Sequence, residues 1–238
     1  MKPIMEAVAS FLLHEVLGNV LAALLLALAG WLLRCVARQR GSLNRPHGDI
    51  RPTLVAVTLR PAGRRISAGP RAHVVVRRFT DGDSVEELTD LLHRAYADHA
   101  AAGRVFFASY QSARDTAHRL GKGECWVALW GNVLVGTVTL SASHTTPEGY
   151  PAPAPAGSFW QLAVDPSARG SGLGQRLLVL AEERIVALGS AQAVIDTSAE
   201  ATELVGWYRR RGYVPVGTWR WDVTNYESVV LAKVLSAC

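Results

Sequence analysis

Cysteine is scarce in this sequence, and no pair of residues has the spacing of a metal site. The three cysteines, Cys35, Cys125 and Cys238, form an odd, widely spaced set. Such a set fits neither a disulfide framework nor a CxxC metal site. None of the seven histidines belongs to an HxxxH or HExxH pair. We therefore expect a reducing compartment and no metal.

Charge is also scarce at the start of the chain, and its distribution divides the chain into three parts. The charges of residues 1–36 sum to zero, whereas residues 37–73 hold eight arginines and one acid, Asp49. The formal net charge of the whole chain is +5, so residues 74–238 carry a small negative excess. We expect a membrane-anchor helix at 1–36, an Arg/Pro/Gly-rich linker at 37–73 and one folded domain at 74–238. The basicity belongs to the linker and does not indicate the substrate of the domain.

The first part contains 18 consecutive residues without a charge, Val16 to Leu33. As a helix this run would span roughly 27 Å, close to the ~30 Å thickness of a bilayer core. Trp31 lies near one end, and Arg34 and Arg38 follow it, so the positive-inside rule predicts that the C-terminal side faces the cytoplasm. The expectation is a single-pass inner-membrane protein with its domain in the cytoplasm, or otherwise a cytoplasmic protein.

Other interpretations of the first 73 residues stay open. A cleaved signal peptide is disfavoured because the basic residues follow the apolar run, and Arg34 is unsuitable before a lipidated cysteine. A buried or amphipathic helix and an erroneous extension of the gene remain alternatives. The linker arginines would suit anionic lipid headgroups, or they are simply solvated. No nucleic-acid partner is expected, because no aromatic residues interleave with these arginines. Residues 54–59 are a candidate short strand within the linker.

From residue 73 onward, apolar segments alternate regularly with turn-forming residues. This pattern predicts a mixed α/β (α+β) domain of about seven strands and four helices. The expected strands are 73–79, 124–130, 133–141, 158–164, 193–198, 213–223 and 228–235, and the expected helices are 84–102, 112–120, 172–189 and 201–212. A βαβ crossover around the helix at 172–189 predicts one parallel strand pair. Five apolar residues share one face of that helix: Leu173, Leu177, Ala181, Ile185 and Leu188. The Pro-rich loop at 142–157 is too long for a simple turn, and loops of this length often have a functional role.

Three glycines, Gly170, Gly172 and Gly174, stand beside Arg169 where a predicted strand gives way to this helix. Glycines at such a junction leave backbone N–H groups uncovered, and these groups together with the helix dipole suit a phosphate or pyrophosphate. The spacing lacks the Lys-Ser/Thr of a P-loop, and it differs from the GxGxxG of a Rossmann fold. Taken alone, the cluster is equally consistent with a tight turn for helix packing.

A second motif, "WYRRRGY", follows some thirty residues later. Together the two motifs resemble the GNAT superfamily of acetyl-CoA-dependent N-acyltransferases, over roughly residues 74–235. Arg169, Gly172 and Gly174 match the family's Q/R-x-x-G-x-G/A motif. The family's hydrophobic-Tyr-x-x-x-Gly-aromatic signature is matched by Trp207, Tyr208, Gly212 and Tyr213.

The resemblance implies an N-acetyltransferase that moves an acetyl group from acetyl-CoA to a primary amine, by direct attack in a ternary complex. It implies that backbone N–H groups cradle the CoA pyrophosphate along Arg169, Gly170, Ser171, Gly172, Leu173, Gly174 and Gln175. The strand Leu162, Ala163 and Val164 would bond the pantetheine and polarise the thioester carbonyl. Tyr208 would protonate the departing sulfur. The acceptor amine and the oligomeric state are not indicated.

One departure from the family concerns the general base. Many relatives carry a glutamate on the strand before the glycine loop, where this sequence has Ser158. Water, Asp196, Glu200 or His144 could serve instead, and the sequence does not choose among them. The missing carboxylate leaves a CoA-binding sensory or structural domain without turnover as an alternative. A membrane-tethered interaction protein with a purely structural glycine turn is a third interpretation.

Overall fold

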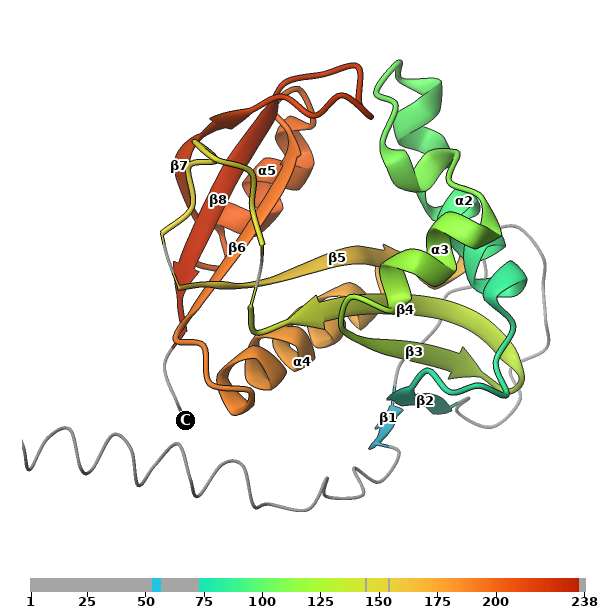
Figure 1. The fold of residues 1–238 in the computed structure, drawn as a ribbon. Helices are drawn as coiled ribbons and strands as arrows, with labels where there is room; N and C mark the ends of the chain where they lie inside the picture. The colour runs from blue at the N-terminus through green and yellow to red at the C-terminus, as the bar shows by residue number, and fades with distance from the viewer. Residues whose placement is uncertain (1–52, 57–72, 144, 154, 236–238) are drawn as a thin grey trace, which may run out of the picture. The chain divides into compact units, whose positions relative to one another are not determined.

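The computed structural model describes residues 53–56, 73–143, 145–153 and 155–235. These residues form one eight-stranded sheet in the order β1-β2-β3-β4-β5-β6-β8-β7 (Figure 1). The strands are β1 (Thr53–Ala56), β2 (His73–Arg78), β3 (Glu124–Trp130), β4 (Val133–Ser141), β5 (Gly157–Val164), β6 (Gln192–Ser198), β7 (Val214–Trp219) and β8 (Ser228–Val234). The α-helices are α2 (Val85–Ala101), α3 (Ala113–Leu120), α4 (Leu173–Ala187) and α5 (Thr202–Arg209), with short 3₁₀ turns η1 (Phe107–Ser109) and η2 (Pro166–Ala168).

The predicted α/β architecture is confirmed for the domain. The seven strands β2 to β8 and four α-helices follow the expected order, and β5 and β6 form the expected parallel pair across α4. The eighth strand, β1, comes from the candidate short strand in the linker and pairs antiparallel with β2. Strand β7 ends at Trp219, earlier than expected, because the chain leaves the sheet there to form the loop 220–227.

The predicted membrane span at residues 16–33 lies outside the described residues, as does His144. Among the residues that are described, no helix is both long enough and apolar enough to cross a bilayer. The membrane anchor, the lipid contacts of the linker and the localisation therefore stay predictions.

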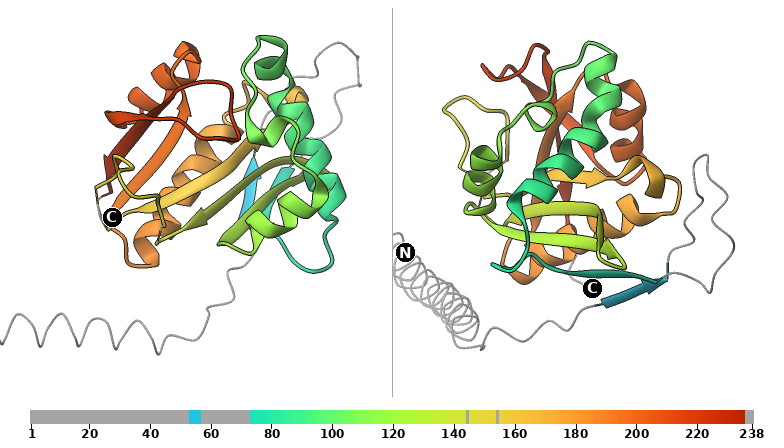
Figure 2. Two further views of the ribbon diagram at one scale, coloured as in Figure 1. Left: turned by 45° about the horizontal axis from the view of Figure 1, so that its top comes forward. Right: turned by 90° about the vertical axis from the view of Figure 1, so that its right-hand side faces the viewer.

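Helices cover both faces of the sheet (Figure 2). Helix α4 packs on β4, β5 and β6, and α2 packs on β4 and β5 from the other side. Four of the five predicted apolar positions on α4 are buried: Leu173, Leu177, Ala181 and Ile185. The fifth position, Leu188, lies just outside the helix. It is 43% exposed, because α4 ends at Ala187 and Leu188 is its C-cap.

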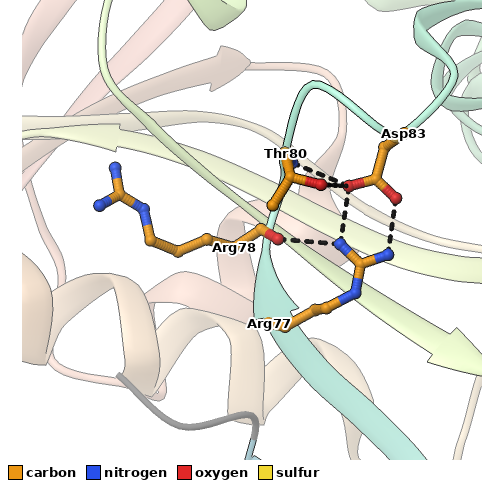
Figure 3. Close-up of polar contacts among 4 residues, drawn as sticks. All are labelled: Arg77, Arg78, Thr80 and Asp83. Atoms are coloured by element: carbon orange, nitrogen blue, oxygen red, sulfur yellow. Dashed lines mark hydrogen bonds and ion pairs between the residues drawn. The ribbon is translucent and has the colours of Figure 1, made fainter. Parts of the chain in front are cut away.

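The turn between β2 and α2 is closed by an ion pair (Figure 3). Both terminal nitrogens of Arg77 donate to the Asp83 carboxylate, at 2.6 and 2.7 Å. The Thr80 backbone N–H and hydroxyl donate to the same carboxylate, at 2.8 and 3.0 Å. The hydrogen bond from Arg77 is the main reason that the pKa of Asp83 falls to about 2. This turn sets the start of α2, whose far end borders the site described next.

Candidate active site: a cleft between β5 and β6

A β-bulge interrupts β5 at the centre of the sheet. Thr137 of β4 faces Ala163 and Thr139 faces Trp160, so two residues of β5 stand opposite one residue of β4. One of the two, Gln161, has φ = 54° and is the only non-glycine with positive φ among the described residues. An L-residue in this region costs about 1–2 kcal/mol. Such strain persists only where surrounding structure enforces it, and it is found most often at functional sites.

Beyond its first two residues, β5 is no longer paired with β6, although it stays paired with β4. Only Gly157 and Ser158 pair with β6, and then the two strands diverge (Figure 1). The Asp165 N–H donates to the Val135 carbonyl of β4, so the N–H of the preceding residue, Val164, points to the open side. The divergence leaves a cleft of about 1690 Å³. Since pockets for a single ligand measure roughly 300–1,000 Å³, this cleft has room for two substrates.

The glycine loop forms one end of the cleft. Gly170 and Gly172 adopt φ values of +74° and +85°, which L-residues rarely adopt. The backbone N–H groups of Gly170, Gly172, Gly174 and Gln175 have no hydrogen-bond acceptor within the part of the chain that the structure describes. They surround the start of α4, where the helix dipole adds a partial positive charge. The arrangement is suited to an anion, as the sequence predicted.

Two of the predicted cradle N–H groups, and the hydroxyl of Ser171, are engaged within the loop. The Arg169 N–H donates to the Pro166 carbonyl at 3.3 Å, and the Leu173 N–H donates to the Ser171 hydroxyl at 3.3 Å. The Ser171 hydroxyl itself donates to the Ala168 carbonyl at 2.6 Å. These bonds shape the loop and leave the glycine N–H groups to face the cleft.

Helix α2 holds the glycine loop in place through two ion pairs. Arg94 donates to Asp165 at 3.0 Å, just before the loop. The Arg169 side chain pairs with Asp98 and also donates to the Ala95 carbonyl at 2.7 Å. Because α2 lies about seventy residues earlier in the chain, these contacts fix the loop against a separate element.

A cation from the end of α5 also lies beside the start of α4. Arg211 donates to the Gln175 side chain at 3.2 Å and to the Trp207 carbonyl at 2.9 Å. Its guanidinium lies 3.8 Å from the centroid of the Trp207 ring. The positive charge of Arg211 therefore adds to the electrostatic attraction of this end of the cleft for anions.

Tyr208, the predicted proton donor, is buried in the wall of the cleft. Its ring packs on Tyr213 and Phe159, at centroid distances of 5.6 and 6.3 Å. Its hydroxyl has no hydrogen-bond partner among the described residues. Burial is the main cause that raises the pKa of Tyr208, with the neighbouring Tyr96 and Asp196 adding to it. The phenol therefore stays protonated at neutral pH and can act as a proton donor.

Asp196 lies in the same cleft, on β6. Its Oδ2 accepts hydrogen bonds from Trp221 and Ser228, both at 2.9 Å, and its Oδ1 accepts one from Tyr150 at 3.3 Å. A carboxylate has about four acceptor positions, so the described residues leave one on Oδ1 open. Tyr150 comes from the Pro-rich loop and Trp221 from the loop after β7, so two loop regions converge on this carboxylate.

The candidates for the general base that the sequence left open differ in their position relative to the cleft. Asp196 lines the cleft, whereas Glu200 is exposed and is not part of the cleft wall. Ser158, where many relatives have glutamate, is buried and lines the cleft. A charge inside the apolar strand "AVIDTS" was the available sequence signal for Asp196. No group of three or more His, Cys, Asp or Glu side chains in the described residues could hold a metal ion.

A sequence model of the acetyltransferase (GNAT) family matches residues 85–213, more than half of the chain. The chain belongs to the GNAT family. The matched range runs from the first residue of α2 to Tyr213, and it contains the bulged strand, the glycine loop and Tyr208. The predicted membership of this acetyltransferase family is therefore confirmed.

The names of two curated relatives of this GNAT chain state different compounds. The mycothiol acetyltransferase of Cellulomonas flavigena is 29% identical over 142 residues, which cover 59% of this chain and 40% of the relative. The S-(2-succino)cysteine N-acetyltransferase of Bacillus subtilis is 28% identical over 153 residues, which cover 62% of this chain and 86% of the relative. The match thus spans only about two fifths of the mycothiol enzyme.

Among solved structures, a GNAT acetyltransferase from Streptococcus agalactiae superposes with a TM-score of 0.55. It is 18% identical, and the alignment covers 69% of this chain and 96% of that one. PH1933 from Pyrococcus horikoshii superposes with a TM-score of 0.54 at 16% identity, covering 69% and 99% of the two chains. At these identities the likeness establishes the fold alone.

Proposed function

We propose that this chain transfers the acetyl group of acetyl-CoA to a primary amine, by direct attack within a ternary complex. The observation that carries the proposal is the continuity of the cleft between β5 and β6. One cavity joins the uncovered N–H groups of the glycine loop, the open edge of β5, Tyr208 and Asp196. Holding both substrates in one cavity supplies much of the rate of such a transfer through positioning.

The glycine-loop end of the cleft suits the pyrophosphate of CoA. Gly170, Gly172, Gly174 and Gln175 would donate backbone hydrogen bonds to it, and Arg211 would contribute a nearby positive charge. An ideal Cβ built on Gly172 meets no atom within 4 Å, so the space in front of this residue is open. Leu162, Ala163 and Val164 would lie along the pantetheine, and an N–H directed to the open edge would polarise the thioester carbonyl.

We assign Asp196 as the group that takes a proton from the amine. An amine arrives mostly as an ammonium ion and must lose a proton before it can attack. The open acceptor position on Asp196 Oδ1 can take that proton, while the three donors to this carboxylate hold it in place. The orientation of Asp196 does not depend on the substrate, so the acceptor enters a preformed site.

Tyr208 completes the transfer. The amine nitrogen forms a bond to the thioester carbon, the carbon–sulfur bond breaks, and its electron pair leaves on sulfur. Tyr208 donates its proton to that sulfur, and the proton that the attacking nitrogen gives up restores the phenol. The products are an amide and the free thiol of CoA, so that atoms and charges balance. Because the phenol of Tyr208 is protonated at neutral pH, its proton is available when the thiolate forms.

The alternative is a CoA-binding domain without turnover, which Ser158 favours because no carboxylate lies on β5. Release of free thiol from acetyl-CoA, measured against a panel of primary amines, separates the two functions. Amine-dependent thiol release supports the transferase. Acetyl-CoA binding in calorimetry without thiol release for any amine would support the alternative. The name of the Bacillus subtilis relative, S-(2-succino)cysteine N-acetyltransferase, suggests cysteine-derived amines as the first to test.

A further inference from the structure

The cleft wall contains a cation whose guanidinium has no hydrogen-bond acceptor among the described residues. Arg119 lies in the last turn of α3 and lines the cleft. Its Nε is buried, and no carboxylate, carbonyl or hydroxyl among the described residues accepts a hydrogen bond from its guanidinium. The guanidinium carbon lies 5.4 Å from the centroid of the Phe107 ring, which holds the group without neutralising it.

The nearby carboxylates are committed to other donors. Asp115 and Asp196 both attract Arg119 electrostatically. However, Asp115 Oδ2 accepts bonds from the Ser112 N–H and hydroxyl at 2.9 and 2.7 Å, as part of the cap of α3. Asp196 is held by its own three donors. Burial without a matching anion lowers the pKa of Arg119, but a guanidinium stays charged in proteins.

Arg119 lines the same cleft as the proposed reacting groups. Tyr96 and Asp196 each interact electrostatically with Arg119, and the same two residues interact with Tyr208. Arg119, Tyr208 and Asp196 all line this one cleft. Two other arginines of the cleft wall differ, since Arg169 is paired with Asp98 and Arg211 is bonded to Gln175.

We propose that Arg119 binds a carboxylate of the acceptor, and that the amines acetylated by this chain are those of amino acids and their derivatives. The inference rests on the proposed function and narrows its acceptor class. A guanidinium offers two parallel N–H donors, which match the two oxygens of a carboxylate. A partly buried cation that lacks an anion is destabilised, and the substrate carboxylate supplies the missing charge. Asp196 and Arg119 then recognise the two opposite charges of an amino acid.

The test compares L-amino acids, beginning with S-methyl-L-cysteine, with the corresponding carboxamides. The carboxamide keeps the amine and deletes the negative charge. Thiol release by the full chain should favour the acid about tenfold to a hundredfold in kcat/KM, the range expected for a hydrogen bond between charged groups. Arg119→Gln should make kcat/KM nearly equal for the acid and the carboxamide, and it should leave the KM for acetyl-CoA unchanged. Arg119→Lys should keep part of the preference for the acid over the carboxamide. This variant serves as a control for folding.

Two control variants locate the effect. Arg114→Gln removes an exposed arginine from the same helix and should keep the wild-type preference. Arg104→Gln removes another cation of the cleft wall whose Nε is buried without a partner among the described residues. Loss of the preference in Arg104→Gln but not in Arg119→Gln would assign the carboxylate to Arg104 and overturn the proposal. Equal rates for acids and carboxamides in the wild type would also overturn it, while leaving the transferase function intact.

Failure of the proposed function itself has a different signature, since no amine of any kind would then release thiol. In that case the binding of a carboxylate by Arg119 is tested by calorimetry, which needs no turnover. N-acetyl-S-methyl-L-cysteine should bind the wild type more tightly than its carboxamide does, and Arg119→Gln should remove the difference. Equal binding of the two compounds to the wild type would contradict the role of Arg119.

Discussion

Replacing Gly172 by aspartate would place a carboxylate where the cradle is proposed to hold a pyrophosphate. The residue has φ = +85°, and a Cβ there would point into open space. Two unit charges about 5 Å apart repel by roughly 3 kcal/mol at an effective dielectric constant near 20, and solvent screening reduces this value. We therefore expect acetyl-CoA to bind the variant about tenfold to a hundredfold more weakly, a loss of roughly 1.4–2.7 kcal/mol.

Backbone strain must be separated from charge in this experiment. Gly172→Asn has nearly the same shape and also tolerates a left-handed backbone, but it carries no charge. The difference in affinity between the Asp and Asn variants, measured by calorimetry with acetyl-CoA, therefore isolates the electrostatic repulsion. That difference should shrink as salt is added, because ions screen the repulsion.

A remote glycine serves as the matched control. Gly131, in the β3–β4 hairpin, has φ = +60°, and a Cβ added there would also meet no atom within 4 Å. Gly131→Asp should lower thermal stability through strain, as Gly172→Asp does, yet leave acetyl-CoA affinity unchanged. If a folded Gly172→Asp protein bound acetyl-CoA as tightly as the wild type, the pyrophosphate could not lie in front of this loop.

Four further perturbations test other parts of the molecule. Tyr208→Phe should lower turnover at least tenfold with little change in the KM for acetyl-CoA, because a general acid acts in the transition state; undiminished turnover would leave Tyr208 with a packing role. Asp196→Asn should lower kcat/KM for the amine by about 10² to 10⁴ at neutral pH and recover in part at high pH, where the amine is already neutral; a loss independent of pH would contradict the base assignment. Asp83→Asn should cost about 1–2 kcal/mol of unfolding free energy at pH 7, as measured by urea titration. Folding lowers the pKa of Asp83 from 3.8 to about 2, so this contribution to stability is present above pH 3.8 and is lost as pH falls toward 2. Equal stability of the variant and the wild type at pH 7 would rule out a stabilising pair. If Val16 to Leu33 spans a membrane, the full chain should resist alkaline carbonate extraction, and recovery in the soluble fraction would favour one of the other interpretations of this segment.

The sequence by itself determined the order of strands and helices and the place of the glycine loop. These features follow from local patterns, namely apolar periodicity along α4, the Gly131-Asn132 turn and glycines at a strand-to-helix junction. Leu188 shows the limit of such patterns. Periodicity continues through this residue, but the helix ends just before it, so the side chain points to solvent.

Only the tertiary structure decided how the cleft is formed and which polar residues face it. The bulge at Gln161 depends on the register between β4 and β5, and the choice of Asp196 over Glu200 depends on donors from two distant loops. Arg119 shows the reason most clearly. In the sequence it is one more basic residue at a helix C-terminus, where the helix dipole favours such residues. Its lack of an anionic partner among the described residues emerges only when the carboxylates around it are seen bonded to other donors, some of them far away in the chain.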